Sequence, residues 1–358
     1  MKNKDIKDCC LTSGMTVREC IEVIDRNKYG IALVVDDGGR LVGTVTDGDI
    51  RRFTLANRSL DELVETVMWQ KPLSAPAGTA DVEIKELMHK KLVRNIPLVD
   101  KEDRPVGIVN VADLIGEEEG LHVAVLMVGG EGKRLMPITE SIPKPMVHVA
   151  DRPILETIIT SLKEAGISRI YLAINHMGDI IEEYFGDGSS FGVEISYLRE
   201  DEKLGTVGAL SLLPELPATP ILVMNGDVVT KTKLMRLLDY HKSHRCVMTV
   251  AATRYSFEIP LGVLDVKGHY LLGLSEKPQQ HFLCNAGIYV INPEVVSLIP
   301  NGLEFNTTDL ISELVRKGLP VTTFPIHEYW VDVGQVDDLK RARKDMASAS
   351  SLDEIEEN

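Results

Sequence analysis

The sequence predicts an α/β protein built from two parts. After residue 121, apolar runs that read as strands alternate with helical patterns, beginning HVAVLMV, ILETIITSLKEAG, RIYLAIN and DIIEEYF. Such alternation is typical of a mainly parallel sheet covered by helices on both faces. A second observation is an internal repeat in the first 120 residues. A third is the length of 358 residues, which exceeds what one hydrophobic core usually serves.

The repeat appears when YGIALVVDDGGRLVGTVTDGDI is laid over RNIPLVDKEDRPVGIVNVADLI with a single one-residue gap. Each copy is preceded by an apolar helical stretch, VRECIEVI in the first and VEIKELMHKKL in the second. A short strand, a turn, a Val-Gly strand and an acid that opens the next helix then follow. We therefore expect two copies of one small α/β unit.

This pattern resembles a pair of CBS repeats over about residues 10–116. The resemblance implies an adenine nucleotide in the cleft between the repeats, with its ribose held by an aspartate. By position, Thr46 and Asp49 in the first copy, and Asn110 and Asp113 in the second, would take those roles. The same residue types are also good helix caps, and many such repeats serve only packing or dimerisation. Because paired repeats often stack on one another, we expect a homo-oligomer.

The domain boundaries follow from composition. The charged joint GEEEGLH separates the repeats, residues 1–120, from a second domain at residues 121–346. The tail, residues 347–358, is small, acidic and aperiodic, which predicts disorder.

The charge balance bears on the partners that the chain can take. A formal net charge of -15 repels nucleic acid phosphates and anionic lipids, so we expect neither nucleic acid nor membrane binding. The longest apolar run, VAVLMV, is too short to span a bilayer. The five cysteines form no CxxC pair, which favours reduced, non-catalytic thiols. We expect a cytoplasmic protein.

A Gly-rich loop, GGEGKRLMPITESIPKP, follows the first strand of the second domain. Glycines let the backbone approach closely and aim N–H groups at phosphate oxygens. Lys133, Arg134 and Lys144 supply positive charge that would neutralise a triphosphate and a leaving pyrophosphate. Its first glycines alone would also suit an ordinary turn, but the longer segment carries more information.

The full segment resembles the signature of sugar-phosphate nucleotidyltransferases, GGxGTRL followed by PxT and PKP, although Lys133 stands where the family usually has Thr. The resemblance implies a Rossmann-like (GT-A-like) domain with a mixed, mainly parallel sheet. It also implies a reaction in which a sugar 1-phosphate is joined to the nucleoside monophosphate part of an NTP, with release of pyrophosphate. The residues that it assigns to the nucleotide are Gly129, Gly130, Gly132 and Lys133, and those that it makes catalytic are Arg134, Lys144 and Asp227.

The segment LREDEKLGTVGAL is where the family binds the nucleobase. A carboxylate at Glu200 can accept two hydrogen bonds from the N1–H and amino group of guanine, whereas Gln there would better suit uracil or thymine. This favours GTP over UTP or dTTP, although Glu200 is also one of several surface acids in REDE. Gly205 and Gly208 would let a base or ribose lie against the backbone.

Two acids at strand ends predict a metal site. Asp227 ends ILVMNGD and Asp332 lies in HEYWVDVGQ, each beside a glycine. A carboxylate at the end of a buried strand needs a partner, and Mg²⁺ favours one or two carboxylates together with phosphate oxygens. Singly, each acid also suits an ordinary turn. The resemblance implies that the two bind the catalytic Mg²⁺ together.

The motifs SEKP and CNAGIYVI match the family's sugar and sugar-phosphate contacts, which implies roles there for Glu276, Lys277, Asn285 and Gly287. His176 and His327 invite a general-base role, but a sugar phosphate is already an ionised nucleophile at neutral pH. We assign these histidines no catalytic role.

The combination of CBS repeats with a transferase domain gives an indication of the substrate. CBS repeats ahead of such a transferase resemble enzymes of bacterial nonulosonic acid pathways, which favours glucosamine 1-phosphate as acceptor and GTP as donor. Mannose 1-phosphate is the alternative acceptor, and uridylyl or thymidylyl transfer the alternative reaction. Two other classes remain open: a catalytically silent sensor of nucleotide sugars, and a glycosyltransferase. The latter would usually show a paired-acid DxD motif, which NGD at residues 225–227 lacks.

Overall fold

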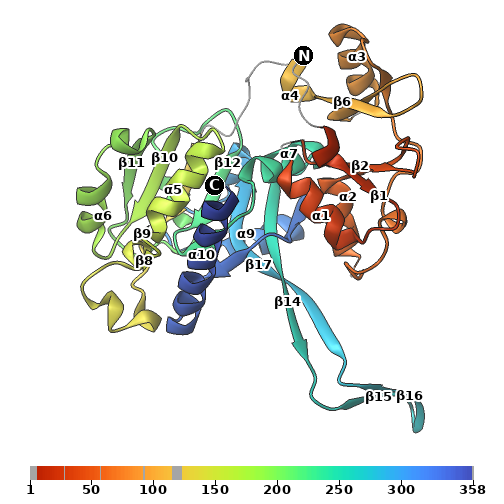
Figure 1. The fold of residues 1–358 in the computed structure, drawn as a ribbon. Coiled ribbons are helices and arrows are strands. Elements are labelled where there is room, and N and C mark those ends of the chain that lie inside the picture. The colour runs from red at the N-terminus through yellow and green to blue at the C-terminus, as the bar shows by residue number, and fades with distance from the viewer. Residues whose placement is uncertain (1–5, 28, 57, 92, 115–122, 357–358) are drawn as a thin grey trace. The chain divides into compact units, whose positions relative to one another are not determined.

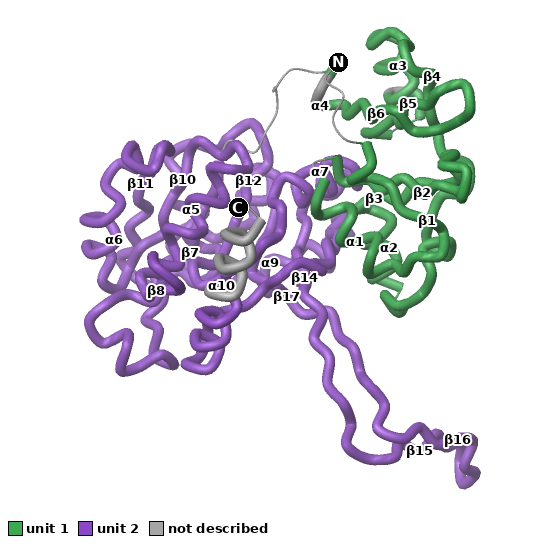
Figure 2. Tube along the Cα trace, viewed as in Figure 1, with its two compact units in different colours: residues 1–118 green, residues 119–358 purple. Residues whose placement is uncertain are grey.

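The computed structural model describes residues 6–27, 29–56, 58–91, 93–114 and 123–356. The side chains of residues 89, 112, 113 and 347–356 are outside that description. The chain divides into two compact units, residues 1–118 and 119–358 (Figure 2). Each unit has its own hydrophobic cores.

The first unit contains the expected two copies of one α/β pattern. In each copy the first two strands are parallel and the last two form an antiparallel hairpin. The first copy consists of η1 (Ile6–Cys9), β1 (Cys10–Thr12), α1 (Val17–Arg26), β2 (Ile31–Val35), β3 (Leu41–Thr46), α2 (Asp47–Leu55) and η2 (Val64–Thr66). The second consists of β4 (Ala75–Pro76), α3 (Asp81–Lys91), β5 (Asn95–Val99), β6 (Pro105–Asn110) and α4 (Val111–Leu114).

The second unit is built on a sheet of seven strands in the order β11-β10-β7-β12-β17-β14-β18 (Figure 1). Among these described strands only β17 runs against the others, so the mixed, mainly parallel sheet is confirmed. The strands are β7 (Val123–Met127), β10 (Arg169–Ile174), β11 (Glu194–Arg199), β12 (Ile221–Asn225), β14 (Met248–Glu258), β17 (Gln279–Ile291) and β18 (Val321–Ile326).

Helices cover both faces of this sheet. One face packs on α5 (Ile154–Glu164), α6 (Gly178–Phe185), α7 (Leu234–His244) and α10 (Val336–Glu356). The other packs on η7 (Gly208–Leu212), α8 (Pro293–Val296) and α9 (Thr307–Arg316). Side chains alternate between the faces along each strand, so Ala124 and Leu126 of β7 enter the first core while Val123 and Val125 enter the second. A strand buried on both sides reads as a continuous apolar run.

Short elements complete the unit. Three two-stranded sheets pair β8 (His148–Val149) with β9 (Arg152–Pro153), β13 (Val228–Thr230) with β19 (Trp330–Asp332), and β15 (Gly262–Lys267) with β16 (Tyr270–Glu276). The 3₁₀ turns are η3 (Lys133–Leu135), η4 (Ile138–Glu140), η5 (Lys144–Met146) and η6 (Ser189–Phe191). Helix α10 runs to Glu356, across most of the segment predicted to be disordered. That segment lacks Gly and Pro and contains Ala and Glu, which favour helix once a preceding helix has nucleated.

A long hairpin extends from the sheet into solvent (Figure 1). Strand β14 pairs with β18 only as far as Thr253, whereas its pairing with β17 continues to Glu258. Beyond that point, β15 and β16 pair only with each other. We call residues 255–283 the arm. Because β7, β12 and β14 are parallel, the arm leaves the sheet at the edge where β7 and β12 end.

Candidate active site

The Gly-rich loop leaves the carboxyl end of β7 and is closed by its glycines. A Cβ at Gly129 would lie 3.0 Å from Cβ of Asn175, so only glycine lets the ends of β7 and β10 approach this closely. Gly132 has φ of 65°, in the left-handed region. A Cβ there would lie 3.1 Å from Cβ of Lys144, whereas a Cβ at Gly130 would meet nothing within 4 Å. Gly130 therefore leaves its backbone open to solvent.

The basic residues after the loop point in different directions. The ammonium of Lys133 pairs with Glu131 at 2.5 Å, and this hydrogen bond lowers the pKa of the Glu131 carboxyl. Arg134 lies near the acids instead, since the positive charge of its guanidinium lowers the pKa of the Asp332 carboxyl. The structure therefore brings Arg134, but not Lys133, to the predicted metal site.

A short strand pair brings the two acids together. Asp227 comes just before β13 and Asp332 ends β19, and Val228 lies opposite Asp332 in the antiparallel register. The N–H of Val333 donates to the carbonyl of Asp227 at 3.0 Å. Strand pairing of this kind spans a long stretch of sequence, so the two carboxylates become neighbours through tertiary structure alone.

Lys144 joins this pair from turn η5, where its residue is buried. Its ammonium nitrogen donates to Oδ2 of Asp227 and lies 3.7 Å from Oδ1 of Asp332. Burial raises the pKa of Asp332, and the nearby Asp227 carboxylate adds to the rise, while Lys144 and Arg134 act in the opposite direction. Two negative charges are thus held close together beside one buried cation.

The donor set fits a divalent metal ion. Oδ1 of Asp227 and Oδ1 of Asp332 are both buried and have no hydrogen-bond partner in the described residues. A carboxylate oxygen buried without a partner is costly, and hard divalent cations prefer such oxygens. These two side chains could therefore hold a divalent metal ion here.

Glu200 follows β11 and shapes the next loop. Its Oε2 accepts a hydrogen bond from the N–H of Leu204 at 2.9 Å, and its carbonyl accepts from Nδ2 of Asn175 at 2.9 Å. Burial raises the pKa of the Glu200 carboxyl, although the Leu204 N–H and Lys203 oppose the rise. One carboxylate oxygen therefore organises the loop, while Oε1 makes no hydrogen bond that the structure records.

The two glycines in this loop lie against another segment of the same domain. Gly205 has φ of 80°, and a Cβ there would lie 2.7 Å from the carbonyl oxygen of Phe305. A Cβ at Gly208 would lie 3.1 Å from the carbonyl of Leu303. The space beside both glycines is filled by the protein's own backbone, which also receives hydrogen bonds from the N–H groups of Val207 and Gly208. They pack this loop against residues 303–305.

Part of the predicted sugar pocket lies beside the acids. Gly287 has φ of 71°, and a Cβ there would lie 2.7 Å from Nδ2 of Asn225. The N–H of Gly287 donates to Oδ1 of Asn285 at 3.0 Å. Asn225, the first residue of the NGD motif, is not among the site residues that the sequence predicts. Asn225 lies next to Gly287 in space and two residues before Asp227 in the chain, which makes it a candidate for the same pocket. Its place in the NGD motif is the sequence feature that could have indicated this role.

The structure does not bring the other two sugar residues to this place. Glu276 ends β16 and Lys277 follows it, so both are exposed residues of the arm. Within the described residues, no recorded hydrogen bond or ion pair connects either side chain to Asp227, Asp332 or Lys144. The turn at Lys277, with φ of 46°, instead directs β16 into β17.

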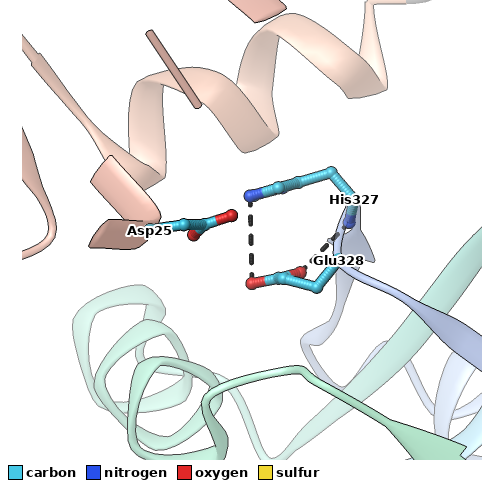
Figure 3. Close-up of side chains that lie close together, drawn as sticks. All are labelled: Asp25, His327 and Glu328. Carbon is cyan, nitrogen blue, oxygen red and sulfur yellow. Dashed lines mark hydrogen bonds and ion pairs between the residues drawn. The ribbon is translucent and has the colours of Figure 1, made fainter. Parts of the chain in front are cut away.

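The histidines lie apart from the acids' hydrogen bonds. His176 is exposed in the turn after β10. His327 follows β18, and its backbone N–H donates to Oε2 of Glu328 at 3.2 Å, while Nε2 lies 3.8 Å from Oε1 (Figure 3). Asp25, which is also drawn in Figure 3, belongs to α1 of the first unit. No recorded hydrogen bond or ion pair links either histidine to Asp227 or Asp332 among the residues that the structure describes.

The predicted ribose residues of the first repeat form a helix cap. The hydroxyl and N–H of Thr46 both donate to Oδ2 of Asp49, and the N–H of Asp49 donates back to the Thr46 hydroxyl at 3.3 Å. Oδ1 of Asp49 accepts from Arg52. This is a capping box at the start of α2. Both carboxylate oxygens of Asp49 are already engaged.

The second repeat carries its counterparts on β6 and α4. Nδ2 of Asn110 donates to Oδ1 of Asn95 at 2.7 Å, and Nδ2 of Asn95 donates to the carbonyl of Tyr29 at 3.1 Å. The bond from Asn95 to Tyr29 links the two repeats within the unit. Asp113 lies in α4, but its side chain is outside the described part of the chain.

Comparisons with known proteins agree with this arrangement. The model of the family "Nucleotidyl transferase" matches residues 123–349, and that of the CBS domain matches residues 4–56 and 64–120. A mannose-1-phosphate guanyltransferase of Candida glabrata is 35% identical over 60% of this chain and 62% of its own length. A UTP–glucose-1-phosphate uridylyltransferase of Synechocystis is 30% identical over 63% of each chain.

Among solved structures, a Bacillus anthracis protein assigned as a glucose-1-phosphate thymidylyltransferase matches with a TM-score of 0.51 and 25% identity, over 62% of this chain and 93% of its own. The chain spans less than two thirds of the length of the curated relatives first matched. No helix in the described residues is long and apolar enough to cross a bilayer. The sheet, the loop and the family match together show that this chain belongs to the nucleotidyl transferase family, with its transferase domain preceded by a pair of CBS domains.

Proposed function

We propose that this chain is a sugar-1-phosphate nucleotidyltransferase. The observation that carries the proposal is the pair of acids, Asp227 and Asp332, whose buried Oδ1 atoms lack hydrogen-bond partners. They meet the buried ammonium of Lys144 at the edge of the sheet from which the Gly-rich loop emerges. Two carboxylates, a buried lysine and open backbone amides suit an enzyme that moves phosphate groups.

In the proposed reaction, an oxygen of the sugar phosphate attacks the α-phosphorus of the NTP, and the bond from the α- to the β-phosphate breaks. Asp227 and Asp332 would hold Mg²⁺, which when bound would supply the positive charge that lets two anionic phosphates approach. Arg134, Lys144 and the amides of residues 129–132 neutralise the pyrophosphate as it leaves. The nucleophile is already ionised, so positioning is the main task of the remaining residues.

GTP is the proposed donor. Glu200 supports this donor, because its Oε1 makes no hydrogen bond that the structure records and its carboxylate would accept from the N1–H and amino group of guanine. The Candida relative named above is called a guanyltransferase, whereas the Synechocystis relative is called a uridylyltransferase. UTP and dTTP are therefore the donors against which GTP must be compared.

Glucosamine 1-phosphate is the proposed acceptor, and its support is the CBS pair ahead of the transferase domain. Mannose 1-phosphate is the second candidate, because several of the matched relatives carry it in their names. The pair of repeats is proposed to bind an adenine nucleotide, since Thr46 and Asp49 occupy the position that CBS domains use for ribose.

The test is a panel in which the purified full chain, with Mg²⁺, meets four NTPs and several hexose 1-phosphates, and pyrophosphate release is measured. GTP with glucosamine 1-phosphate is expected to give the highest kcat/KM. Highest activity with mannose 1-phosphate would identify that sugar phosphate as the acceptor in place of glucosamine 1-phosphate. Highest activity with UTP or dTTP would identify that nucleotide as the donor in place of GTP. Pyrophosphate from no pair would contradict the transferase activity and support a silent sensor.

A further inference from the structure

The arm, residues 255–283, exposes an unusual amount of apolar surface. More than half of the exposed large apolar side chains in the described residues lie within it. Cross-strand partners Leu264 and Leu274 are 57% and 63% exposed, and Val266 and Leu271, the next apolar pair, are each 60% exposed. Summed over both faces of the hairpin, the arm's apolar side chains present on the order of 1,000 Å² of exposed surface.

A hairpin of this kind needs a partner. Two strands alone are marginally stable in water, and a third strand or a packed face is usually required. Within the described residues, β15 and β16 pair with no third strand, and their side chains belong to none of the hydrophobic cores of the second unit. The exposed edges and apolar face are features that proteins normally cover.

The arm also carries residues that the proposed active site needs. Glu276 and Lys277 are the predicted contacts for the sugar and its phosphate, yet both are exposed on the arm. Asn285 and Gly287 lie in the middle of the adjoining strand β17, where Gly287 lies beside Asn225. The site of a single chain in this conformation therefore lacks half of its sugar-phosphate residues.

The geometry of the joint disfavours simple closure onto the same chain. The stem of the arm continues the pairing of β14 and β17 without a break from Ala252 and Asn285 to Glu258 and Gln279. Phe257 stacks on Phe282 across this stem, with ring planes 7° apart. At its far end the N–H of Ile259 donates to the carbonyl of Pro278 at 3.0 Å. Folding the arm back would require bending this paired ladder, whereas reaching a neighbour would not.

We propose that the arm of one chain packs across a second copy of this chain and brings Glu276 and Lys277 to that copy's Lys144, Asp227 and Asp332. The arm leaves the sheet at the edge that carries these acids. Two copies related by a twofold axis, with those edges facing, can therefore exchange arms reciprocally. The apolar surface of the arm suffices for one partner's share of a standard interface, about 800 Å². The active-site part of this inference rests on the proposed function.

Complementation between two inactive variants tests whether the sites are shared. Lys277→Ala damages only the arm's contribution, and Asp227→Asn damages only the body's. Each variant is expected to be inactive when purified alone. The two chains are co-expressed with different tags, and the mixed dimer is isolated by both tags in turn.

The mixed dimer is expected to regain about half of the wild-type activity per dimer, because one of its two sites combines an intact body with an intact arm. If each arm serves its own chain, every site carries one defect and the mixed dimer stays inactive, which would overturn the proposal. Wild-type protein that releases no pyrophosphate would instead refute the proposed function.

The association itself is tested without activity. Leu264→Asp with Leu274→Asp places two charges on the exposed apolar face and leaves the chain's own cores untouched. Sedimentation is expected to show half the wild-type mass for this double variant. The matched control, Leu216→Asp with Val315→Asp, changes two side chains that are 51% and 62% exposed outside the arm, and should keep the wild-type mass. An unchanged mass for the arm variant would overturn the proposal.

Discussion

The ammonium nitrogen of Lys144 lies 3.7 Å from Oδ1 of Asp332. The same nitrogen donates to Asp227, so one buried cation offsets two neighbouring carboxylates. Lys144 thus has a role in the protein before any substrate arrives. Its charge offsets the repulsion between the two acids that we propose as ligands of one metal ion.

Replacing Lys144 with Met is expected to destabilise the metal-free protein by about 2 kcal/mol, because it leaves two close carboxylates with only the exposed Arg134 as a nearby counter-charge. The value is moderate because the Asp332 side chain is 46% exposed. Denaturant unfolding in EDTA measures it, and Mg²⁺ should restore more stability to the variant than to the wild type. Lys340→Met, which removes an exposed lysine paired with Asp337, is the control. Equal stability of the Lys144 variant and wild type in EDTA would contradict the argument.

Asp227→Asn should lower kcat by about 100-fold or more, because it removes one of two charged oxygens that would hold the metal. The fold should survive, since Asn retains the shape of Asp and the backbone bond from Val333 is unaffected. Pyrophosphate release and Mg²⁺ calorimetry measure the two effects. Asp337→Asn, at an exposed position of α10, should behave as wild type. Retention of most activity by Asp227→Asn would remove this residue from the mechanism.

Glu200→Gln should shift the preference from GTP toward UTP or dTTP by about 10- to 100-fold in kcat/KM, because Gln replaces an acceptor of two hydrogen bonds by a donor and an acceptor. The variant can still accept from the N–H of Leu204, so the loop should persist. Glu202→Gln, an exposed neighbour, is the control. An unchanged preference would contradict base recognition by Glu200.

The pH profile gives a second measure of Glu200. Burial raises the pKa of its carboxyl above the ordinary value of 4.5. The ionised form that would accept from guanine is present above the raised pKa and is lost as the pH falls through it. GTP affinity should therefore weaken on acidification while an ordinary Glu is still ionised. The Gln variant cannot titrate and should lack this dependence.

Gly132→Ala should destabilise the protein by about 1–3 kcal/mol, because Ala is strained at φ of 65° and its Cβ would crowd Thr139 and Lys144. Displacement of Lys144 should also reduce pyrophosphate release by about 10-fold or more. Gly130→Ala is the matched control, since a Cβ there meets nothing within 4 Å. Thermal unfolding of the pair decides the matter, and equal losses in both variants would refute this account of Gly132.

Asp49→Ala should cost about 1 kcal/mol, because it removes the capping box at the start of α2. Calorimetry on the full chain with AMP and ATP tests the second role proposed for this residue. Binding to wild type that disappears in Asp49→Ala, but not in the exposed control Asp61→Ala, would support ribose recognition. Binding that persists in Asp49→Ala would limit Asp49 to the helix cap.

The sequence by itself determined the fold class, the repeat and the family. Strands buried on both faces, such as Val123–Met127, must be apolar throughout, and the helices that cover them must be amphipathic, so both patterns are readable along the chain. The Gly-rich loop is equally readable as a continuous run of sequence, and the left-handed φ of Gly132 is a local property, although the close approach of Gly129 is to the distant Asn175. For the tail, the small, acidic and aperiodic composition predicts disorder, whereas α10 extends to Glu356 in the structure.

Only the tertiary structure decided which distant residues meet. No local pattern reveals that β13 pairs with β19, yet that pairing makes Asp227 and Asp332 neighbours. Nor could the sequence reveal that backbone atoms of residues 303–305 fill the space beside Gly205 and Gly208. Lys277 was assigned to a pocket, but the paired stem of β14 and β17 carries it out on the arm. The physical reason is common to all three, because non-local contacts depend on strand pairing and packing that local side-chain periodicity does not encode.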